Sequence, residues 1–236
     1  MNRTLECFEI NEHPVQVIRA NRLKTIGIKV HKGRVSIRAP KKMPLCDIKT
    51  IIVAKQSWIE KKIKQQQETP SAKIKQYITG ECFYYLGEAY TLQIKHDNEA
   101  SVTLEQKKIV LTLPQVLDTP MYRKKILIRW YTQQAETYLD NRVLHYQKYI
   151  GKKPMSLKIR LYKSRWGSCS TTGNITFNWL ILMAPKPVID YVVVHELCHL
   201  IQHNHSLKFW GLVEKVIPEY SIHARWLKQQ TDYFIF

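Results

Sequence analysis

The chain reads His195-Glu196-Leu197-Cys198-His199 inside residues 190–200, a run that contains neither glycine nor proline. Four residues span just over one helical turn, so both imidazoles project from one face of a helix and can bind one metal ion. Glu196, beside the first histidine, would then point toward a water molecule on that metal. Zinc lowers the pKa of such a water to about 7, and a nearby carboxylate accepts its proton as it attacks a carbonyl. The spacing therefore predicts a metal-dependent hydrolase.

The same run is apolar almost all round, which is typical of a helix that only fills a core. Two histidines and a glutamate cost free energy to bury in such a helix unless they have partners. A metal ion binds both histidines and gives the glutamate a charged neighbour. We therefore favour a metal site over a purely structural helix.

A catalytic zinc needs a third protein ligand and an open fourth position. His205 lies six residues beyond His199, which is the offset of the metzincin pattern. That clan is excluded, because Gln202 replaces its glycine and no methionine follows Met183 to form its Met-turn.

The metal helix is instead expected to end near His203-Asn204, because asparagine tolerates the left-handed conformation that ends helices. Ser206 then caps a second helix over residues 207–217, which Pro218 stops. This arrangement would bring His205 back toward the metal at the junction of two helices.

Two other residues are alternatives for the third ligand. His203 is four residues past His199 and shares its face, but it lies two turns from His195, which is far for one ion. Glu214 would be a carboxylate ligand from the second helix, although it follows His199 by fewer residues than the thermolysin pattern has. We prefer His205 over both.

These residues continue an upstream motif. The chain carries, in order, Ser164-Arg-Trp-Gly-Ser-Cys-Ser170, Asn174-Ile-Thr-Phe-Asn178, Pro187, Tyr191-Val-Val-Val-His-Glu-Leu-Cys-His-Leu200 and Asn204-His-Ser-x-x-Phe-Trp210. From about Arg160 to Trp210 it resembles the YgjP-like family of predicted bacterial zinc metallopeptidases, a more distant relative of the SprT-like and WLM proteases. The resemblance implies one Zn²⁺ bound by His195, His199 and His205, with Glu196 as the catalytic base. All four residues match.

A β-hairpin is expected before the metal helix. Residues 157–161 alternate between apolar and basic side chains, residues 166–174 are rich in turn formers, and residues 175–182 are expected to return as the second strand. In zincins an edge strand above the metal helix pairs with the substrate backbone. The resemblance assigns substrate binding to Asn174, Ile175, Thr176, Phe177 and Asn178, and the alternative is a hairpin that only packs on the helix.

Four further side chains are candidates near the cleft. Arg165 and Trp166 can shape it, although a tryptophan before a turn more often belongs to a core. Tyr220 and His223 are candidate donors to the oxyanion that forms during hydrolysis.

The composition indicates a globular protein of 236 residues, enough for one sizeable core or two small domains. Its five cysteines form no C-x-x-C pair and favour a reducing compartment. The first residues lack the apolar stretch of a signal peptide, and no run of about 18 apolar residues occurs. We expect a cytoplasmic protein without a membrane span.

The pattern of apolar residues predicts an α+β fold with two regions. Residues 1–117 form a β-rich basic region with one helix over residues 47–67, and residues 118–236 form a zincin-like half in which the hairpin packs on the metal helix. Thr119-Pro120 begins a long helix that Gly151 ends. Because no internal repeat or low-complexity linker separates the regions, they can share one interface.

The net charge of +18 is concentrated toward the N-terminus, where residues 1–78 hold 17 Lys and Arg against 6 Asp and Glu. Such a surface attracts a phosphate-rich partner or an acidic substrate. A solvated basic face is the simpler interpretation, and no nucleic-acid-binding motif accompanies the charge.

Two functions are consistent with these patterns. The preferred one is a zinc-dependent peptidase that acts on a peptide or protein substrate, because Glu196 is intact. The alternative is a nucleic-acid-associated protein with an inactive zincin fold. A hydrolase of a non-peptide amide would use the same residues.

Overall fold

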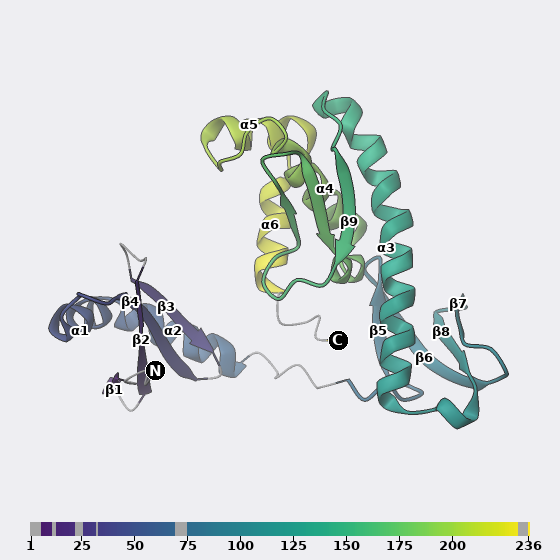
Figure 1. Cartoon of the computed structure of the whole chain (residues 1–236), viewed down its shortest axis with the longest axis horizontal. Helices are drawn as coiled ribbons and strands as arrows, with labels where there is room; N and C mark the ends of the chain where they lie inside the picture. Colours follow the sequence, from purple (N-terminus) through teal and green to yellow (C-terminus); the bar gives the residue numbers. More distant parts are fainter. Residues whose placement is uncertain (1–5, 11–12, 22–25, 32, 69–74, 231–235) are drawn as a thin grey trace. The chain divides into compact units, whose positions relative to one another are not determined.

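The computed structural model describes residues 6–10, 13–21, 26–31, 33–68, 75–230 and 236. It divides the chain into two compact units, Met1–Lys73 (unit 1) and Ile74–Phe236 (unit 2), which are coloured purple to blue and teal to yellow in Figure 1. The predicted α+β class is confirmed, since each unit combines helices with sheet. Within the described ranges, no helix has both the length and the apolar composition needed to cross a membrane.

Unit 1 is a four-stranded sheet covered on one face by helices. The strands are β1 (Glu6–Ile10), β2 (His13–Ala20), β3 (Gly27–His31) and β4 (Arg34–Pro40), in the spatial order β1-β2-β4-β3. The central pair β2 and β4 is parallel and the outer pairs are antiparallel. Alternate residues of β2 and β4 are buried against the helices α1 (Leu45–Ala54) and α2 (Gln56–Glu68), and they form the core of this unit.

The single helix expected over residues 47–67 is in fact two helices that separate at Lys55. Each helix buries one pair of isoleucines four residues apart, Ile48 with Ile52 and Ile59 with Ile63. A straight helix over residues 47–67 would be about 32 Å long, whereas the longest strand beneath it, with eight residues, spans only about 26 Å. The break therefore keeps both pairs over the sheet.

Unit 2 begins with a sheet of the same connectivity as that of unit 1. Its strands β5 (Cys82–Tyr85), β6 (Glu88–His96), β7 (Ser101–Glu105) and β8 (Lys108–Leu113) have the order β5-β6-β8-β7, again with a parallel central pair and antiparallel outer pairs. A short 3₁₀ helix, η1 (Gln115–Leu117), and the long helix α3 (Pro120–Ile150) follow. The two sheets are an internal structural repeat, which corrects the expectation that the chain contains none.

The structure divides the chain at residue 73, and not near residue 117 as expected. The physical reason is a shared core, because Leu92 and Leu111 of the second sheet belong to the same hydrophobic cluster as Tyr131 of α3 and Val193 of the metal helix. Strands β5 to β8 are therefore part of the unit that carries the metal motif.

The rest of unit 2 is a small sheet with three helices. The strands β9 (Ser156–Arg160), β10 (Gly167–Cys169) and β11 (Asn174–Asn178) have the order β10-β11-β9. A 3₁₀ helix, η2 (Trp179–Met183), leads into α4 (Lys186–Cys198), and α5 (Leu207–Val216) and α6 (Tyr220–Gln229) complete the unit. In Figure 1 this sheet and α4 lie together beside the C-terminal part of α3.

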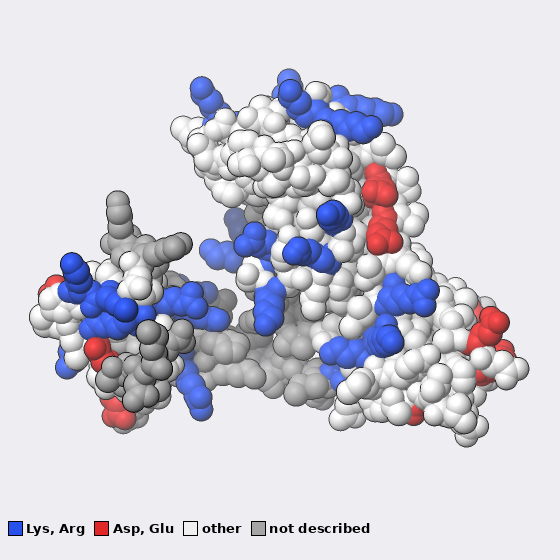
Figure 2. All heavy atoms as spheres, in the orientation of Figure 1, with Lys and Arg blue, Asp and Glu red and all other residues white. Residues whose placement is uncertain are grey.

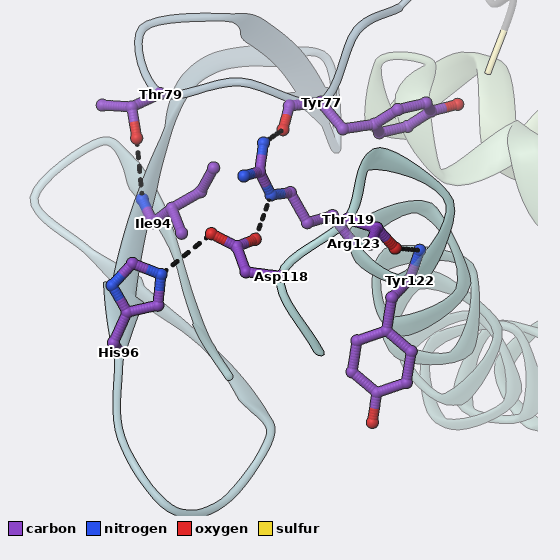
Figure 3. A network of polar contacts seen from close by, with 8 residues as sticks. All are labelled: Tyr77, Thr79, Ile94, His96, Asp118, Thr119, Tyr122 and Arg123. Atoms are coloured by element: carbon purple, nitrogen blue, oxygen red, sulfur yellow. Dashed lines mark hydrogen bonds and ion pairs between the residues drawn. The ribbon is translucent and has the colours of Figure 1, made fainter. Parts of the chain in front are cut away.

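A polar network joins the second sheet to the start of α3 (Figure 3). The Asp118 carboxylate accepts hydrogen bonds from Arg123 and, at 2.8 Å, from Nε2 of His96 on β6. The same arginine donates to the carbonyl oxygen of Tyr77 at 3.0 Å. The bonds from Arg123 and His96 lower the pKa of Asp118 to about 2.

Helix α4 is held at two places along its length. The Asp190 carboxylate accepts two hydrogen bonds from the Arg142 guanidinium of α3, at 2.6 and 2.8 Å. Gly87, in the β5–β6 turn with φ +84°, packs so closely on Pro185 that an added Cβ would lie 2.6 Å from the Pro185 Cα. Both contacts fix the helix that presents the metal motif.

Candidate metal centre

The first two histidines of the motif lie at the C-terminal end of α4. His195 is in its last turn and His199 is its C-cap residue, so the helix ends five residues before the expected His203. Asn204 does not adopt the left-handed conformation that was expected of it. Its side-chain oxygen instead accepts hydrogen bonds from the Ser206 backbone N–H at 3.3 Å and from Gln202 Nε2 at 2.7 Å, and these bonds hold the turn between α4 and α5.

The turn brings His205 to the other two histidines, as predicted. Among the described residues, one group of three potential metal ligands is found, and it consists of His195, His199 and His205, whose ligand atoms lie within 4.8 Å of one another. The Nε2 atoms of His195 and His205 are 3.1 Å apart. The Nδ1 atom of His199 lies 3.0 Å from the Gln202 carbonyl oxygen, which leaves its Nε2 for a metal.

This donor set fits a zinc ion. Two nitrogens that each lie about 2.0–2.1 Å from a tetrahedral zinc are roughly 3.3 Å apart, close to the separation of the Nε2 atoms of His195 and His205. Burial, helped by the neighbouring His199 and His205, lowers the pKa of His195 to about 3. Burial also lowers the pKa of His199. The neutral imidazole is the form that binds metals.

Aromatic side chains of α5 hold the imidazoles in place. Phe209 stacks on His199, with ring centroids 4.5 Å apart, and Trp210 stacks on His205 at 5.6 Å. Trp210 also stacks on Tyr220 at 5.1 Å. Both α5 residues belong to the motif Asn204-His-Ser-x-x-Phe-Trp210, but sequence reasoning gave them no role, because stacking between α5 and the turn is a tertiary contact.

Glu196 is buried against the backbone of β10. Glu196 is only 5% exposed, and a Cβ added to Gly167 would lie 2.6 Å from the Oε1 atom of Glu196. Burial raises the pKa of Glu196 to about 8, and the nearby Arg165 partly opposes this rise. Gly167 is thus a residue of the site that the sequence reading treated only as part of a turn. Gly167 is the first residue of the three-residue strand β10, within a stretch that the sequence analysis interpreted as a turn.

Strand β11 lies at the centre of its sheet, and not at the edge position that backbone pairing with a substrate requires. Residues Asn174 to Asn178 form the central strand, paired with β10 on one side and with β9 on the other. Ile175 and Phe177 are fully buried. The backbone of β11 is therefore occupied on both sides and is not free to pair with a substrate.

The hairpin is also formed by other strands than expected. The strand β9 runs parallel to β11, and the hairpin is formed by β10 and β11. Asn178, at the end of β11, donates from its amide to the carbonyl oxygens of Tyr162 and Arg165, at 3.0 and 3.1 Å. It therefore positions the loop that leads into β10. Among the described strands, none pairs with the outer edge of β10.

The alternative ligands lie outside the histidine group. His203 and Glu214 are both exposed, and neither is a member of the group of ligand atoms. Tyr220 and His223, the candidate oxyanion donors, both lie near the Tyr191 ring, with centroids 6.5 Å apart in each case. Their role in stabilising an oxyanion stays a prediction.

Comparison with known families defines the class of protein. The model of the family described as "YgjP-like, metallopeptidase domain" matches residues 24–230, a range that spans both units. The protein is thus a metallopeptidase, with the histidine group as its possible metal site. The chain belongs to the YgjP-like family, as its motifs predict.

The crystal structure of the metallopeptidase zymogen of Pyrococcus abyssi abylysin is similar over 39% of this chain and 93% of that chain, with 26% identity and a TM-score of 0.36. Comparison with curated proteins gave no match.

Proposed function

We propose that the protein is a zinc-dependent peptidase in which His195, His199 and His205 bind the metal and Glu196 is the general base. The observation that supports this proposal most directly is the convergence of three imidazoles beside a buried carboxylate. An all-imidazole set suits Zn²⁺ among the common divalent ions. Zinc bound there would lower the pKa of a coordinated water to about 7 and polarise the carbonyl of a peptide bond.

The side chains around the metal have separate tasks. Glu196 accepts a proton from the attacking water and delivers it to the leaving amine. Its burial against Gly167 excludes bulk water and fixes the carboxylate. The Gln202 carbonyl orients the His199 ring, and Phe209 and Trp210 restrict the rings of His199 and His205.

The backbone of the substrate would pair with β10 in place of the β11 strand that the sequence suggested. The edge of β10 away from β11 pairs with no described strand, and Gly167 of the same strand touches Glu196. A peptide that adds to this edge would have its backbone held beside the carboxylate, by the strand-addition mode known from other peptide-binding proteins.

The substitution Glu196→Gln tests this function, because it preserves the size of the side chain and removes the base. Zinc content, measured by elemental analysis of the full chain, should stay near one per chain, and peptidase activity should fall about 10²-fold or more. His195→Ala is the matched control and should lose most of the metal. A Glu196→Gln protein that cleaves peptides at the parent rate would show that Glu196 is not the base.

A nucleic-acid partner stays a prediction for unit 1. Arg34 and Arg38 on β4 and Lys29 on β3 are exposed on the sheet face opposite the helices, because Lys29 pairs with Ser36 between the two arginines. Figure 2 shows Lys and Arg side chains gathered on the visible face of this unit, with fewer Asp and Glu. Binding of DNA that weakens steeply with salt is expected if these charges contact phosphates, and salt-independent binding would argue against it.

A further inference from the structure

A groove lies in unit 2 between the edge strand β7 and the first half of α3. Its volume is about 410 Å³, which is in the range of ligand-binding pockets. Arg142 marks the place where α3 contacts the metal helix, 13 residues beyond Arg129 in the groove. At 1.5 Å per residue, the groove is roughly 20 Å along α3 from that contact. The groove is therefore distinct from the metal centre.

Helix α3 forms one wall of this groove, with apolar side chains inside it and positively charged side chains at its rim. Tyr122, Ile126 and Trp130 follow one another at four-residue intervals along one stripe of α3 and line the groove. Lys125 and Arg129, also four residues apart, lie on the neighbouring stripe and are exposed. Neither cation forms a hydrogen bond or an ion pair with any residue in the described part of the chain.

The opposite wall is a strand with one free side. In the order β5-β6-β8-β7, strand β7 is the last, and no other described strand pairs with its outer edge. Val102 of β7 pairs with the fully buried Leu111 and therefore faces the same side of the sheet as α3, where it lines the groove. Figure 1 shows β7 and β8 at the end of unit 2 where α3 begins.

We propose that this groove is a docking site for an extended, acidic peptide segment of a partner protein. Edge strands bind extended peptides through backbone hydrogen bonds, and every second side chain of such a peptide points to the same side, here toward α3. Acidic side chains would meet Lys125 and Arg129, and apolar side chains between them would pack on Val102 and Trp130. The charge of the rim matches the net charge of +18, which attracts acidic partners at long range. The site does not depend on the proposed hydrolysis.

Binding is measured with the full-length, zinc-loaded Glu196→Gln protein, so that no cleavage can interfere. The probe is a fluorescein-labelled peptide in which glutamate alternates with valine and threonine, followed by fluorescence anisotropy at low salt. We expect saturable binding that weakens about tenfold or more in a variant with both Lys125→Glu and Arg129→Glu. The same peptide with lysine in place of glutamate should not bind. Because zinc content and peptidase activity are assayed separately, failure of the proposed catalytic function leaves this measurement intact.

The variant with Lys152→Glu and Lys153→Glu is the matched control. It makes the same change in net charge at exposed positions beyond the C-terminal end of α3, and its affinity for the peptide should equal that of the parent. Melting temperatures of both variants check that the fold is retained. Equal weakening by the two variants, or a single-stranded oligonucleotide that binds the groove more tightly than the acidic peptide does, would overturn the proposal.

Discussion

The close contact between Gly167 and Glu196 makes Gly167→Ala the sharpest test of how the site works. The added Cβ would lie 2.6, 2.7 and 2.8 Å from the Oε1, Cγ and Cδ atoms of Glu196. Because Glu196 is buried, its carboxylate has little room to move aside. Either the side chain rotates away from the metal centre or β10 shifts outward, and overpacking of this kind typically costs about 1–3 kcal/mol.

The expected result is a loss of activity without a loss of metal. If the carboxylate is displaced, kcat/KM for a fluorogenic peptide should fall by about 10²-fold, the lower end of the contribution of a general base. Zinc content should stay at the parent level, since the atoms nearest the added Cβ belong to Glu196 and not to a histidine. In the Glu196→Gln background, Gly167→Ala should cause little further loss, because both changes act on the same group.

Gly211→Ala is the control in the same region. Gly211 lies within α5, and an added Cβ there meets nothing within 4 Å. This change should leave activity unchanged and raise stability by about 0.5–1 kcal/mol, because alanine favours helix over glycine. If Gly167→Ala retains kcat/KM within about threefold of the parent, the carboxylate is not held in place by this contact and the reasoning fails.

Two further predictions follow from the ligand set and from the network at the start of α3. His205→Ala should weaken zinc binding by orders of magnitude in a chelator competition, whereas His203→Ala should change it less than about tenfold, and the reverse ranking would falsify the ligand assignment. Asp118 has its folded pKa lowered to about 2, below its value of about 3.9 in an unfolded chain. Its contribution to stability is therefore present above about pH 4 and lost as the pH falls toward 2. Urea unfolding at several pH values should show that the free energy of unfolding falls between about pH 4 and pH 2 in the parent and falls less in Asp118→Asn. An equal pH dependence of this free energy in both proteins would rule out a role for the carboxylate.

The histidine group was predictable from the sequence because its geometry is local. His195 and His199 are placed by one turn of a helix, and His205 follows within six residues through a turn that Asn204 and Ser206 hold. The reason given for that turn was nevertheless wrong, since Asn204 acts through its side chain and not through a left-handed backbone.

The surroundings of Glu196 were not predictable because they come from distant parts of the chain. Gly167 precedes Glu196 by 29 residues, and only the pairing of β10 with β11 brings its backbone to the carboxylate. The same limit explains the error about β11. Alternation of apolar residues shows that a strand is half-buried, but it does not show whether the strand lies at the centre or at the edge of its sheet.

The repeated sheet was missed for a related reason. In both copies, a buried residue of the second strand pairs with a buried residue of the fourth, Val15 with Val35 and Leu92 with Ile109. This register needs only apolar side chains at alternate positions, which many sequences satisfy, so the copies share few identical residues. In the second copy, the turn between the first two strands contains Gly87, which packs on Pro185 at the start of α4. The common module is thus specified by pattern alone, whereas its use as a support for the metal helix depends on tertiary contacts, among them a shared core and a close approach that requires glycine.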